Sequence, residues 1–324
     1  MEDEELLTGE SEAKPRPRHT IQYTPSSQFG ILVGMAFVGL ILGSLLGLVP
    51  ALISGVSLLT FASNMDNPAY TNLIRLMQLI STVCTFLFPV WIYQRVVRPP
   101  KDFLHVRTHS STRLWLLVIG LAFASMPVTD LMGTINQVIP IPTSLAKTFQ
   151  QIEDNYNTQV MAMMRMNGVG DLLISLFIIA LLPAVLEETF FRGGFQNILV
   201  QWVKKPFWAI LITSVVFSAI HGSYYGFLPR AFLGLLLGYV YCWTKDLKMN
   251  ILIHFINNAT SVVTMYVLSQ KKQLTPENMN ESLPWYWQLG GLVLFVFVAW
   301  RVRERSSSNP TPARSPKGDG RSDG

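Results

Sequence analysis

The sequence contains few charged residues and few cysteines. Of its 324 residues only 14% are charged, whereas 50% are hydrophobic, and the mean hydropathy is +0.34. A soluble domain rarely has this balance, whereas a membrane protein with several spans commonly does. The two cysteines, Cys84 and Cys242, lie in separate apolar runs without a CxxC pair. We therefore expect neither a disulfide framework nor a cysteine-based zinc site.

Several motifs that would indicate other functions are also missing. The sequence has no GxGxxG and no GxxxxGK[ST], so nothing supports a nucleotide partner. It has no HExxH, the pattern of the zincin metalloproteases. The net charge of +5 does not indicate nucleic acid, because the basic residues cluster beside apolar runs. The partner that the composition favours is the lipid bilayer.

The apolar residues fall into runs of about 20, the length that a helix needs to cross hydrocarbon. We predict an all-α integral membrane protein, in which about eight transmembrane helices form a single bundle with a polar intramembrane cavity. The first span is expected to bend near Pro50, where a proline interrupts the helical hydrogen bonds. The predicted spans are residues 29–55, 73–94, 113–135, 170–191, 207–222, 229–243, 250–268 and 285–301.

Polar segments border this bundle. Residues 1–28 are predicted to form a polar cytoplasmic tail, residues 29–304 the transmembrane bundle, and residues 305–324 a cytoplasmic tail. The last segment is rich in Ser, Pro and Gly and should be disordered. A long connection, 136–169, ends in "MAMMRMNG", and we expect its methionines to pack on the bundle.

The distribution of Lys and Arg predicts the orientation. With the N-terminus in the cytoplasm, the segments on that side hold 19 of these residues, and the opposite side with its helix ends holds 6. An excess of basic residues marks the cytoplasmic side of a membrane protein. The sequence therefore predicts an integral protein of the cell or inner membrane with both termini in the cytoplasm.

Three charges follow an apolar run in "EETFFR", residues 187–192. Charge in a membrane helix costs about 2.5–3.5 kcal/mol per residue at the bilayer centre, so such residues usually face a cavity or a partner. Glu188 and Arg192 are four apart, share a helix face and can pair. Glu187 lies about 100° round the helix and can point elsewhere. The alternative reading is a cytoplasmic helix end, where charges cost little.

Two further motifs place histidines in apolar runs. His221 closes "FSAIHG" four residues after Phe217, and a lone histidine of this kind is often a packing residue. His254 and Asn258 are four apart in "HFINN" and share one face of their helix. A carboxylate, two imidazoles and an amide from three helices are the groups that proton transfer or water activation needs.

These motifs resemble those of the CAAX-protease and bacteriocin-processing family of intramembrane proteases, which includes the type II CAAX prenyl endopeptidases. That family carries EExxxR, FxxxH and HxxxN or HxxxD on successive helices. Here they read "EETFFR", "FSAIH" and "HFINN" in the same order. The resemblance covers about residues 170–268, which would form a protease-like catalytic core. It implies an eight-helix bundle with a cavity open to the cytoplasm, and hydrolysis of a peptide bond.

The resemblance also implies a role for each residue. Glu187 would activate water and His221 would share that work. His254 and Asn258 would stabilise the oxyanion or complete the other half of the site. The supporting residues implied are Glu188 and Arg192 as a structural or polarising pair, together with Phe217 of the second motif.

The family mechanism has two versions, and the sequence leaves both open. In one version Glu187, His221 and His254 ligate a metal, usually taken as zinc, that lowers the pKa of its bound water. In the other, no metal takes part, and glutamate and histidine act directly as the base. The substrate would be a membrane protein or peptide, and nothing in the sequence shows whether it is prenylated.

Two other functions fit the same composition. A transporter could use Glu and His as a proton relay, although we see no inverted repeat of the kind such proteins carry. A scaffold derived from the family would lack a motif residue, and none is missing here.

The predicted spans place the motif residues at different depths. If span 207–222 begins at the cytoplasmic face, His221 lies about 22 Å inside, at about 1.5 Å per residue. Glu187 and His254 would instead lie near the cytoplasmic ends of their helices. The helices that carry Glu187 and His221 must therefore extend beyond the hydrocarbon or tilt strongly if these side chains are to meet.

Overall fold

Helices and short connections make up the part of the chain that a computed structural model describes, residues 22–65, 67–100, 102–106, 110–279 and 281–307. Within these residues there is no β-strand. The α-helices are α1 (Pro25–Gly47), α2 (Val49–Ile53), α3 (Leu58–Ser63), α4 (Thr71–Thr82), α5 (Phe88–Val96), α6 (Thr112–Val138), α7 (Thr143–Met163), α8 (Val169–Ser175), α9 (Leu182–Glu188), α10 (Asn197–Val203), α11 (Pro206–Ala219), α12 (Phe227–Thr244), α13 (Leu247–Gln270), α14 (Pro276–Met279) and α15 (Trp285–Ser307).

Most of these helices join into spans that are long and apolar enough to cross a membrane. There are 7 such spans among the described residues, and α11 is a shorter apolar helix beside them. Large hydrophobic side chains face outward, as lipid-facing residues do; Phe37 is 65% exposed, Ile53 81% and Val293 73%. The prediction of an all-α membrane bundle of about eight helices is confirmed, since the described residues form seven spans and one shorter apolar helix.

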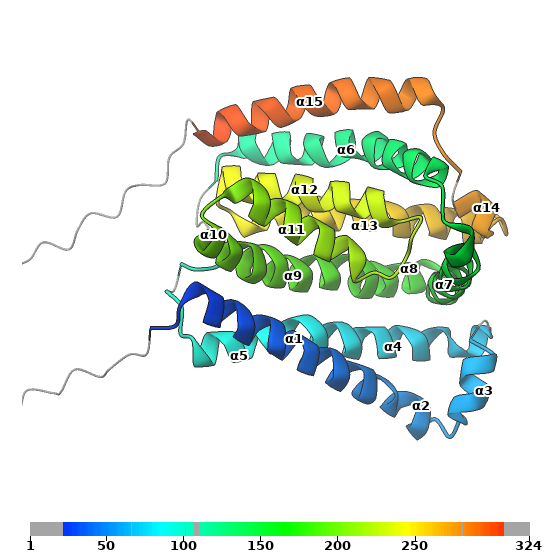
Figure 1. Cartoon of the computed structure of the whole chain (residues 1–324). Helices are drawn as coiled ribbons and strands as arrows, with labels where there is room; N and C mark the ends of the chain where they lie inside the picture. The colour runs from blue at the N-terminus through cyan, green and yellow to red at the C-terminus, as the bar shows by residue number, and fades with distance from the viewer. Residues whose placement is uncertain (1–21, 66, 101, 107–109, 280, 308–324) are drawn as a thin grey trace, which may run out of the picture.

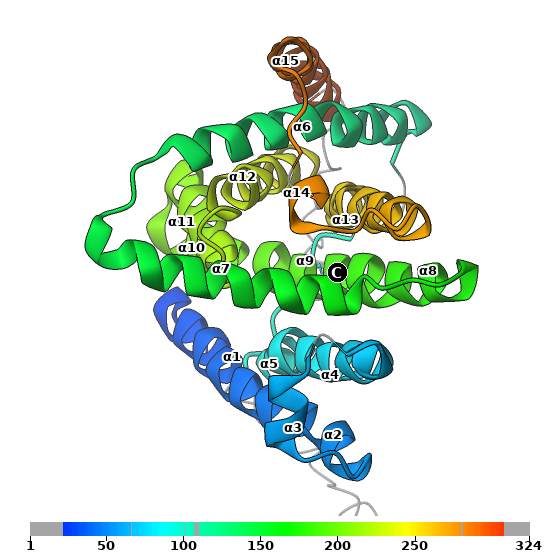
Figure 2. The ribbon, with the colours of Figure 1, turned by 90° about the vertical axis from the view of Figure 1, so that its right-hand side faces the viewer.

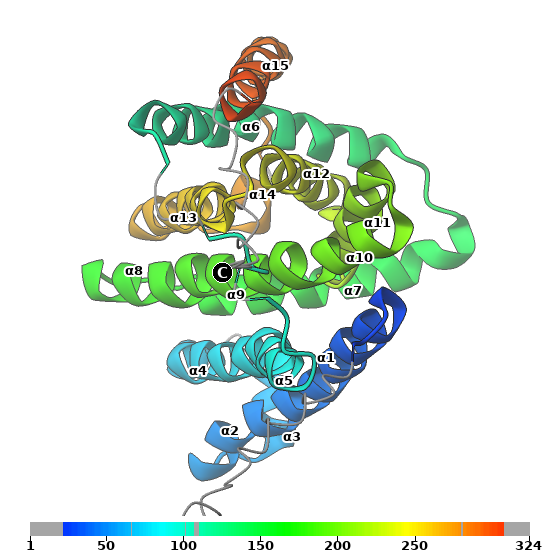
Figure 3. The ribbon, with the colours of Figure 1, turned by 90° about the vertical axis from the view of Figure 1, so that its left-hand side faces the viewer.

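The helices lie in layers, as Figures 2 and 3 show from opposite ends. On one side α15 packs on α6, and on the other α1 packs against α4 and α5. Helices α9, α11, α12 and α13 lie between these layers. Helix α1 begins and α15 ends at the same end of the bundle, as Figure 1 shows, which agrees with an even number of crossings.

Two predicted boundaries differ from the observed ones. Helix α1 starts at Pro25, inside the predicted tail 1–28, and α15 continues to Ser307, past the predicted start of the second tail at 305. The rest of these tails, residues 1–21 and 308–324, lies outside the described residues. The first span breaks as expected near Pro50, because α1 ends at Gly47 and α2 begins at Val49.

The helix that carries "EETFFR" is much longer than predicted. Instead of ending near residue 191, it runs from Val169 to Val203 through α8, α9 and α10. Its α-helical parts are joined by two π-helical segments, Leu176–Leu181 and Thr189–Gln196. Sixteen residues separate Glu187 from Val203, or about 24 Å at about 1.5 Å per residue. Glu187 thus lies at the depth expected for His221, and the reading of "EETFFR" as a helix end is wrong.

Two of the π-helical segments lie just before a proline, and the proline explains their positions. The segment Leu176–Leu181 immediately precedes the turn that holds Pro183, and another, Val83–Leu87, precedes Pro89. A proline ring clashes with the carbonyl group four residues earlier and leaves it without a donor. The wider π-turn relieves this clash while the helix continues. Both spans therefore cross the bundle without a break.

The connection 136–169 is largely helical. It forms α7, which lies across the end of the bundle opposite the ends of the described chain, as Figures 1 and 2 show. Met164 and Met166, 6% and 1% exposed, pack in a cluster with Ala180 and Val262, so the methionines pack on the bundle as predicted. Arg75 of α4 holds this connection by donating to the carbonyl groups of Met163 and Arg165 at 3.0 and 2.8 Å.

Glycine allows α11 and α12 to approach closely. A Cβ atom at Gly234 would lie 2.9 Å from the Cα atom of Ser214. Since backbone cannot move aside as a flexible side chain can, we expect Gly234→Ala to destabilise the protein by about 1–3 kcal/mol, as overpacking does. The measurement is the Tm in detergent. Gly120→Ala is the control, because no heavy atom lies within 4 Å of its added Cβ. Equal Tm values for the two variants would contradict this packing.

Candidate functional site

A buried carboxylate lies at the centre of the site. One oxygen of Glu188, Oε1, accepts a hydrogen bond from Arg192 Nη1 at 2.7 Å and another from His254 Nδ1 at 2.9 Å. The side chains of Glu188 and Arg192 are 0% exposed, and that of His254 is 4% exposed. The predicted Glu188–Arg192 pair is therefore present, and it extends to a histidine on a different helix.

The second face of Arg192 binds backbone and an aromatic ring. Its Nη2 donates to the carbonyl oxygen of Gly234 on α12 at 3.1 Å, and its guanidinium lies 4.9 Å from the ring centroid of Phe217 on α11. A cation over an aromatic face is stabilised by the ring quadrupole, most strongly where water is excluded. Because Arg192 is buried in the bundle, it is not one of the basic residues that mark the cytoplasmic side.

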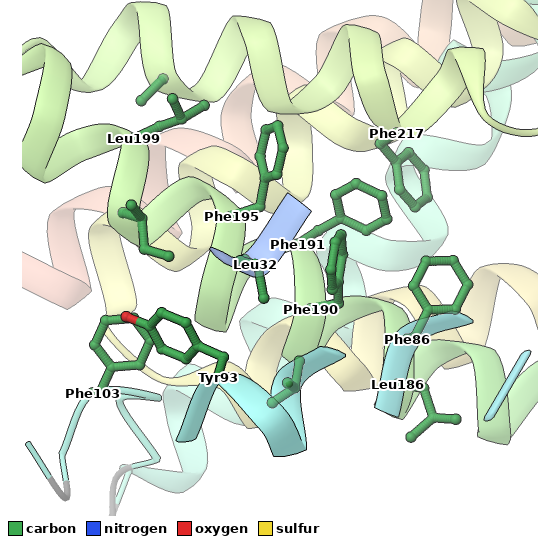
Figure 4. Packing of buried hydrophobic residues seen from close by; sticks show 13 residues of the cluster. Leu32, Phe86, Tyr93, Phe103, Leu186, Phe190, Phe191, Phe195, Leu199 and Phe217 are labelled. Atoms are coloured by element: carbon green, nitrogen blue, oxygen red, sulfur yellow. The ribbon is translucent and has the colours of Figure 1, made fainter. Parts of the chain in front are cut away.

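Phe217 links the two motif histidines. Its ring meets that of His221 at 5.1 Å and that of His254 at 5.8 Å, edge to face in both cases. It is 1% exposed and belongs to an aromatic cluster with Phe190, Phe191 and Phe195, which Figure 4 shows. The cluster fixes the ring of Phe217, and the two histidines pack on it from α13 and from the end of α11.

Glu187 is not held as Glu188 is. Its Oε2 atom is buried without a hydrogen-bond partner, and it lies 3.9 Å from Nε2 of His254. That distance is too long for a direct hydrogen bond. It suits two groups that are bridged by one water oxygen. The predicted division between a tied and a free glutamate agrees with these contacts.

His221 has one ring nitrogen engaged. Its Nδ1 lies 2.7 Å from the carbonyl oxygen of Phe217, which can only accept, so Nδ1 carries the hydrogen. In the neutral ring Nε2 is then an acceptor. The ring is half-buried, and His221 lies two residues after the end of α11 at Ala219. His221 thus presents a basic nitrogen away from its own backbone.

Asn258 is the motif residue that lies apart. It is half-buried on α13 one turn beyond His254, and its side-chain oxygen accepts from Asn257 at 3.4 Å. Among the contacts of the described residues, none joins it to Glu187, His221 or His254. The shared helix face was predicted correctly, but the amide does not take part in the Glu188 cluster.

Two polar residues that the sequence reading missed continue the cluster along α12. Gln196 donates to the carbonyl oxygen of Gly238 at 3.1 Å, and Asn250 donates to that of Leu237. Gln196 stands four residues after Arg192, and Gly238 stands four residues after Gly234. The bond from Gln196 to Gly238 therefore repeats the bond from Arg192 to Gly234 one helical turn further along. The matching spacing of two polar residues and two glycines was the signal in the sequence.

Helix α7 holds the segment that follows His221. Ser223 donates to Oε2 of the buried Glu153 at 2.9 Å, and the Ser223 hydroxyl accepts from the backbone of Gly226 at 3.0 Å. Four residues earlier on α7, Phe149 stacks on Tyr224 at 5.0 Å. The segment is thereby fixed from outside as well as by Phe217.

The same face of α7 binds the start of α12. Tyr156, three residues after Glu153, accepts a hydrogen bond from Arg230 Nη2 at 2.7 Å, and the guanidinium lies 5.0 Å from its ring centroid. The contact residues of α7 are thus spaced by four and three, the repeat of one helix face. The sequence alone does not single out these residues, because a phenylalanine, a glutamate and a tyrosine at this spacing form no recognisable motif.

The three side chains proposed as zinc ligands do not form a ligand set here. Within the described residues, no three His, Cys, Asp or Glu side chains come together in a way that could hold a metal ion. His254 uses Nδ1 for Glu188, and His221 uses Nδ1 for Phe217. An engaged Nδ1 leaves Nε2 of each ring available, as in metal-bound histidines, so it is the placement of the three side chains that does not match a three-ligand zinc site.

Comparison with known families agrees with the motifs. Residues 169–260 match the family model described as type II CAAX prenyl endopeptidase Rce1-like. The match covers all three motifs and confirms the predicted resemblance. No curated protein and no solved structure matches the chain.

We expect Glu188→Gln to destabilise the protein strongly, because it removes the counter-charge that is hydrogen-bonded to the buried guanidinium of Arg192. Removing one partner of a buried pair costs about 3–5 kcal/mol. The measurement is the Tm in detergent. Glu304→Gln is the matched control, because Glu304 pairs with Arg301 at 2.8 Å on the exposed surface, where such a pair contributes little. A Glu188→Gln Tm as high as that of the control would show that the pair is not structural.

We expect Glu153→Ala to loosen the segment 220–226. Losing a hydrogen bond to a buried carboxylate costs about 1.5–3 kcal/mol, or roughly ten- to a hundredfold faster amide exchange if local opening controls it. Hydrogen–deuterium exchange read by mass spectrometry measures this. Asp154→Ala is the control, since among the described residues the exposed Asp154 side chain bonds only to Gln150 on its own helix. Unchanged exchange in Glu153→Ala would show that α7 does not stabilise the segment 220–226.

Proposed function

We propose that this chain, whose residues 169–260 match the Rce1-like family of CAAX endopeptidases, is a membrane-embedded endopeptidase that hydrolyses a peptide bond of a membrane-associated protein or peptide. One observation carries the proposal. Oε1 of Glu188 accepts hydrogen bonds from both Arg192 and His254, whereas the adjacent Glu187 makes no side-chain hydrogen bond to the described residues and its Oε2 lies 3.9 Å from His254.

Charge balance supports Glu187 as the proton acceptor. The cluster holds two acids, Glu187 and Glu188, and two bases, Arg192 and His254. Arg192 and Glu188 neutralise each other at 2.7 Å. The remaining pair is neutral overall whether the proton is on His254 or on Glu187. One proton can therefore move between them without creating net charge, which a buried site of low dielectric would penalise.

The reaction follows from these positions. Water bound beside Glu187 gives its proton to the carboxylate, and its oxygen attacks the carbon of the scissile carbonyl group. The tetrahedral intermediate collapses as the carbon–nitrogen bond breaks. The proton held by Glu187 passes to the leaving nitrogen, which departs as an amine, and the other product is a carboxylic acid.

His254 and Asn258 are proposed to stabilise the oxyanion. Glu188 at 2.9 Å from Nδ1 orients the His254 ring and stabilises it as the imidazolium, as the buried aspartate does in serine proteases. Nε2–H then points toward Glu187 and the reacting atoms. Asn258 offers its amide N–H groups one turn along α13, and it would take part when the substrate fills the space between.

His221 is proposed to share in water activation. Its Nδ1–H is fixed on the carbonyl oxygen of Phe217, so Nε2 is the nitrogen that can accept a proton. Phe217 sets the orientation of both histidine rings by packing between them. We assign the metal-free version of the mechanism, since the side chains do not form a three-ligand set. The substrate class suggested by the family is a protein with a C-terminal CAAX sequence.

We expect Glu187→Gln to lower kcat for cleavage of a farnesylated, internally quenched CAAX peptide by about a hundredfold or more, since general base catalysis contributes about 10²–10⁴-fold. The assay uses the purified full chain in lipid vesicles. The Tm of the variant should stay near that of the wild type, because Glu187 Oε2 makes no hydrogen bond that the variant would lose. Cleavage by the wild type should persist in a strong metal chelator.

Two results would contradict the proposal. A Glu187→Gln protein that cleaves at the wild-type rate would remove Glu187 from the mechanism. Loss of cleavage in the chelator, with recovery on adding zinc, would overturn the metal-free assignment.

A further inference from the structure

A cleft opens between α6 and α15, away from the Glu188 cluster. It has a volume of about 570 Å³ and lies where α6 begins and α15 ends. Figure 1 shows these two helix ends side by side, at the end of the bundle where the described chain begins and ends. The proposed hydrolysis uses no residue of this cleft.

The polar end of the cleft is basic. Arg113, Arg301 and Arg305 line it together with a single acid, Glu304. Three arginines and one glutamate give the lining a net charge of +2. Within it, Arg301 pairs with Glu304 at 2.8 Å. The N-terminus of α6 adds to this field, because its first turn contains no acidic residue to offset the helix dipole.

The other end of the cleft is apolar. Leu116 and Leu117 follow Arg113 by one turn on α6, and Val298 precedes Arg301 by one turn on α15. The cleft thus changes from basic at the helix ends to apolar toward the middle of the spans. A phospholipid is arranged in the matching order along the membrane normal, with a charged phosphate group at the surface and apolar acyl chains beneath it.

The apolar end is also open. Gly120 lines it, and a Cβ atom built there would meet no heavy atom within 4 Å. Helix glycines in this protein that serve close packing, such as Gly234, would instead place a Cβ within about 3 Å of a neighbour. Gly120 therefore leaves space in the cleft and does not bring two helices together.

From this arrangement we propose that the cleft binds one anionic phospholipid, with its phosphate on the arginines and an acyl chain along Leu116, Leu117 and Val298. Guanidinium groups bind phosphate through paired hydrogen bonds, and basic pockets between membrane helices bind acidic headgroups. A soluble anion would use the basic end alone. The apolar end, which faces the hydrocarbon, is what favours a lipid.

The test is native mass spectrometry of the delipidated full chain after adding phosphatidylglycerol or phosphatidylcholine. We expect one phosphatidylglycerol to stay bound to the wild type, in preference to phosphatidylcholine. The triple variant Arg113→Gln, Arg301→Gln, Arg305→Gln should bind about a hundredfold more weakly, or roughly fivefold for each arginine removed. Arg303→Gln is the matched control, because Arg303 lies on α15 outside the lining.

A steric variant tests the apolar end without changing charge. Gly120→Leu should fill the cleft and reduce phosphatidylglycerol retention at least tenfold, with its Tm unchanged. Gly290→Leu is the control, since Gly290 lies near the other end of α15 and also has open space around its Cβ position. Inorganic phosphate should not displace the lipid. Equal retention of both lipids, wild-type retention by Gly120→Leu, or displacement by phosphate would overturn the proposal.

Discussion

The arrangement of the site depends on one oxygen atom, Oε1 of Glu188, which accepts from Arg192 and from His254 at the same time. That atom joins the long helix of residues 169–203 to α13, and Arg192 extends the connection to the backbone of α12 and the ring of Phe217 on α11. Four helices are thus tied to one buried carboxylate. Because burying charge without partners is costly, the position of Glu188 fixes the rotation of each helix that contributes a partner.

The rest of the fold brings these helices together at one depth. The π-helical segment Leu176–Leu181 lets the helix of residues 169–203 continue past Pro183 and still reach both faces of the bundle. Gly234 and Gly238 let α12 approach closely enough for its carbonyl groups to accept from Arg192 and Gln196. Helix α7 fixes the segment after His221 from the end of the bundle. A rigid surround of this kind is what a site needs if its groups are to act without rearrangement.

Part of this could be predicted from the sequence. The spacing of four between Glu188 and Arg192 predicted their pair, and the period of the helix separated Glu187 from it, because both are properties of one continuous helix. The partnership of Glu188 with His254 could not be predicted, since it depends on how two helices are rotated against each other. The length of the helix through Glu187 was underestimated because hydropathy places a boundary at the first charges, whereas these charges are neutralised inside the bundle. Asn258 shows the same limit. Its place on the same helix face as His254 predicts the direction of its side chain, but it does not predict a contact with the Glu188 cluster.

The claim most open to direct test is that only one of the two adjacent glutamates is chemically available. A hydrophobic carbodiimide reacts with carboxyl groups that it can reach inside a membrane protein, and fragmentation of the modified peptide shows which residue carries the label. We expect a label on Glu187, with loss of peptide cleavage in proportion to labelling, and none on Glu188, which is 0% exposed and bound twice. A label on Glu188, or cleavage that survives complete labelling of Glu187, would contradict it.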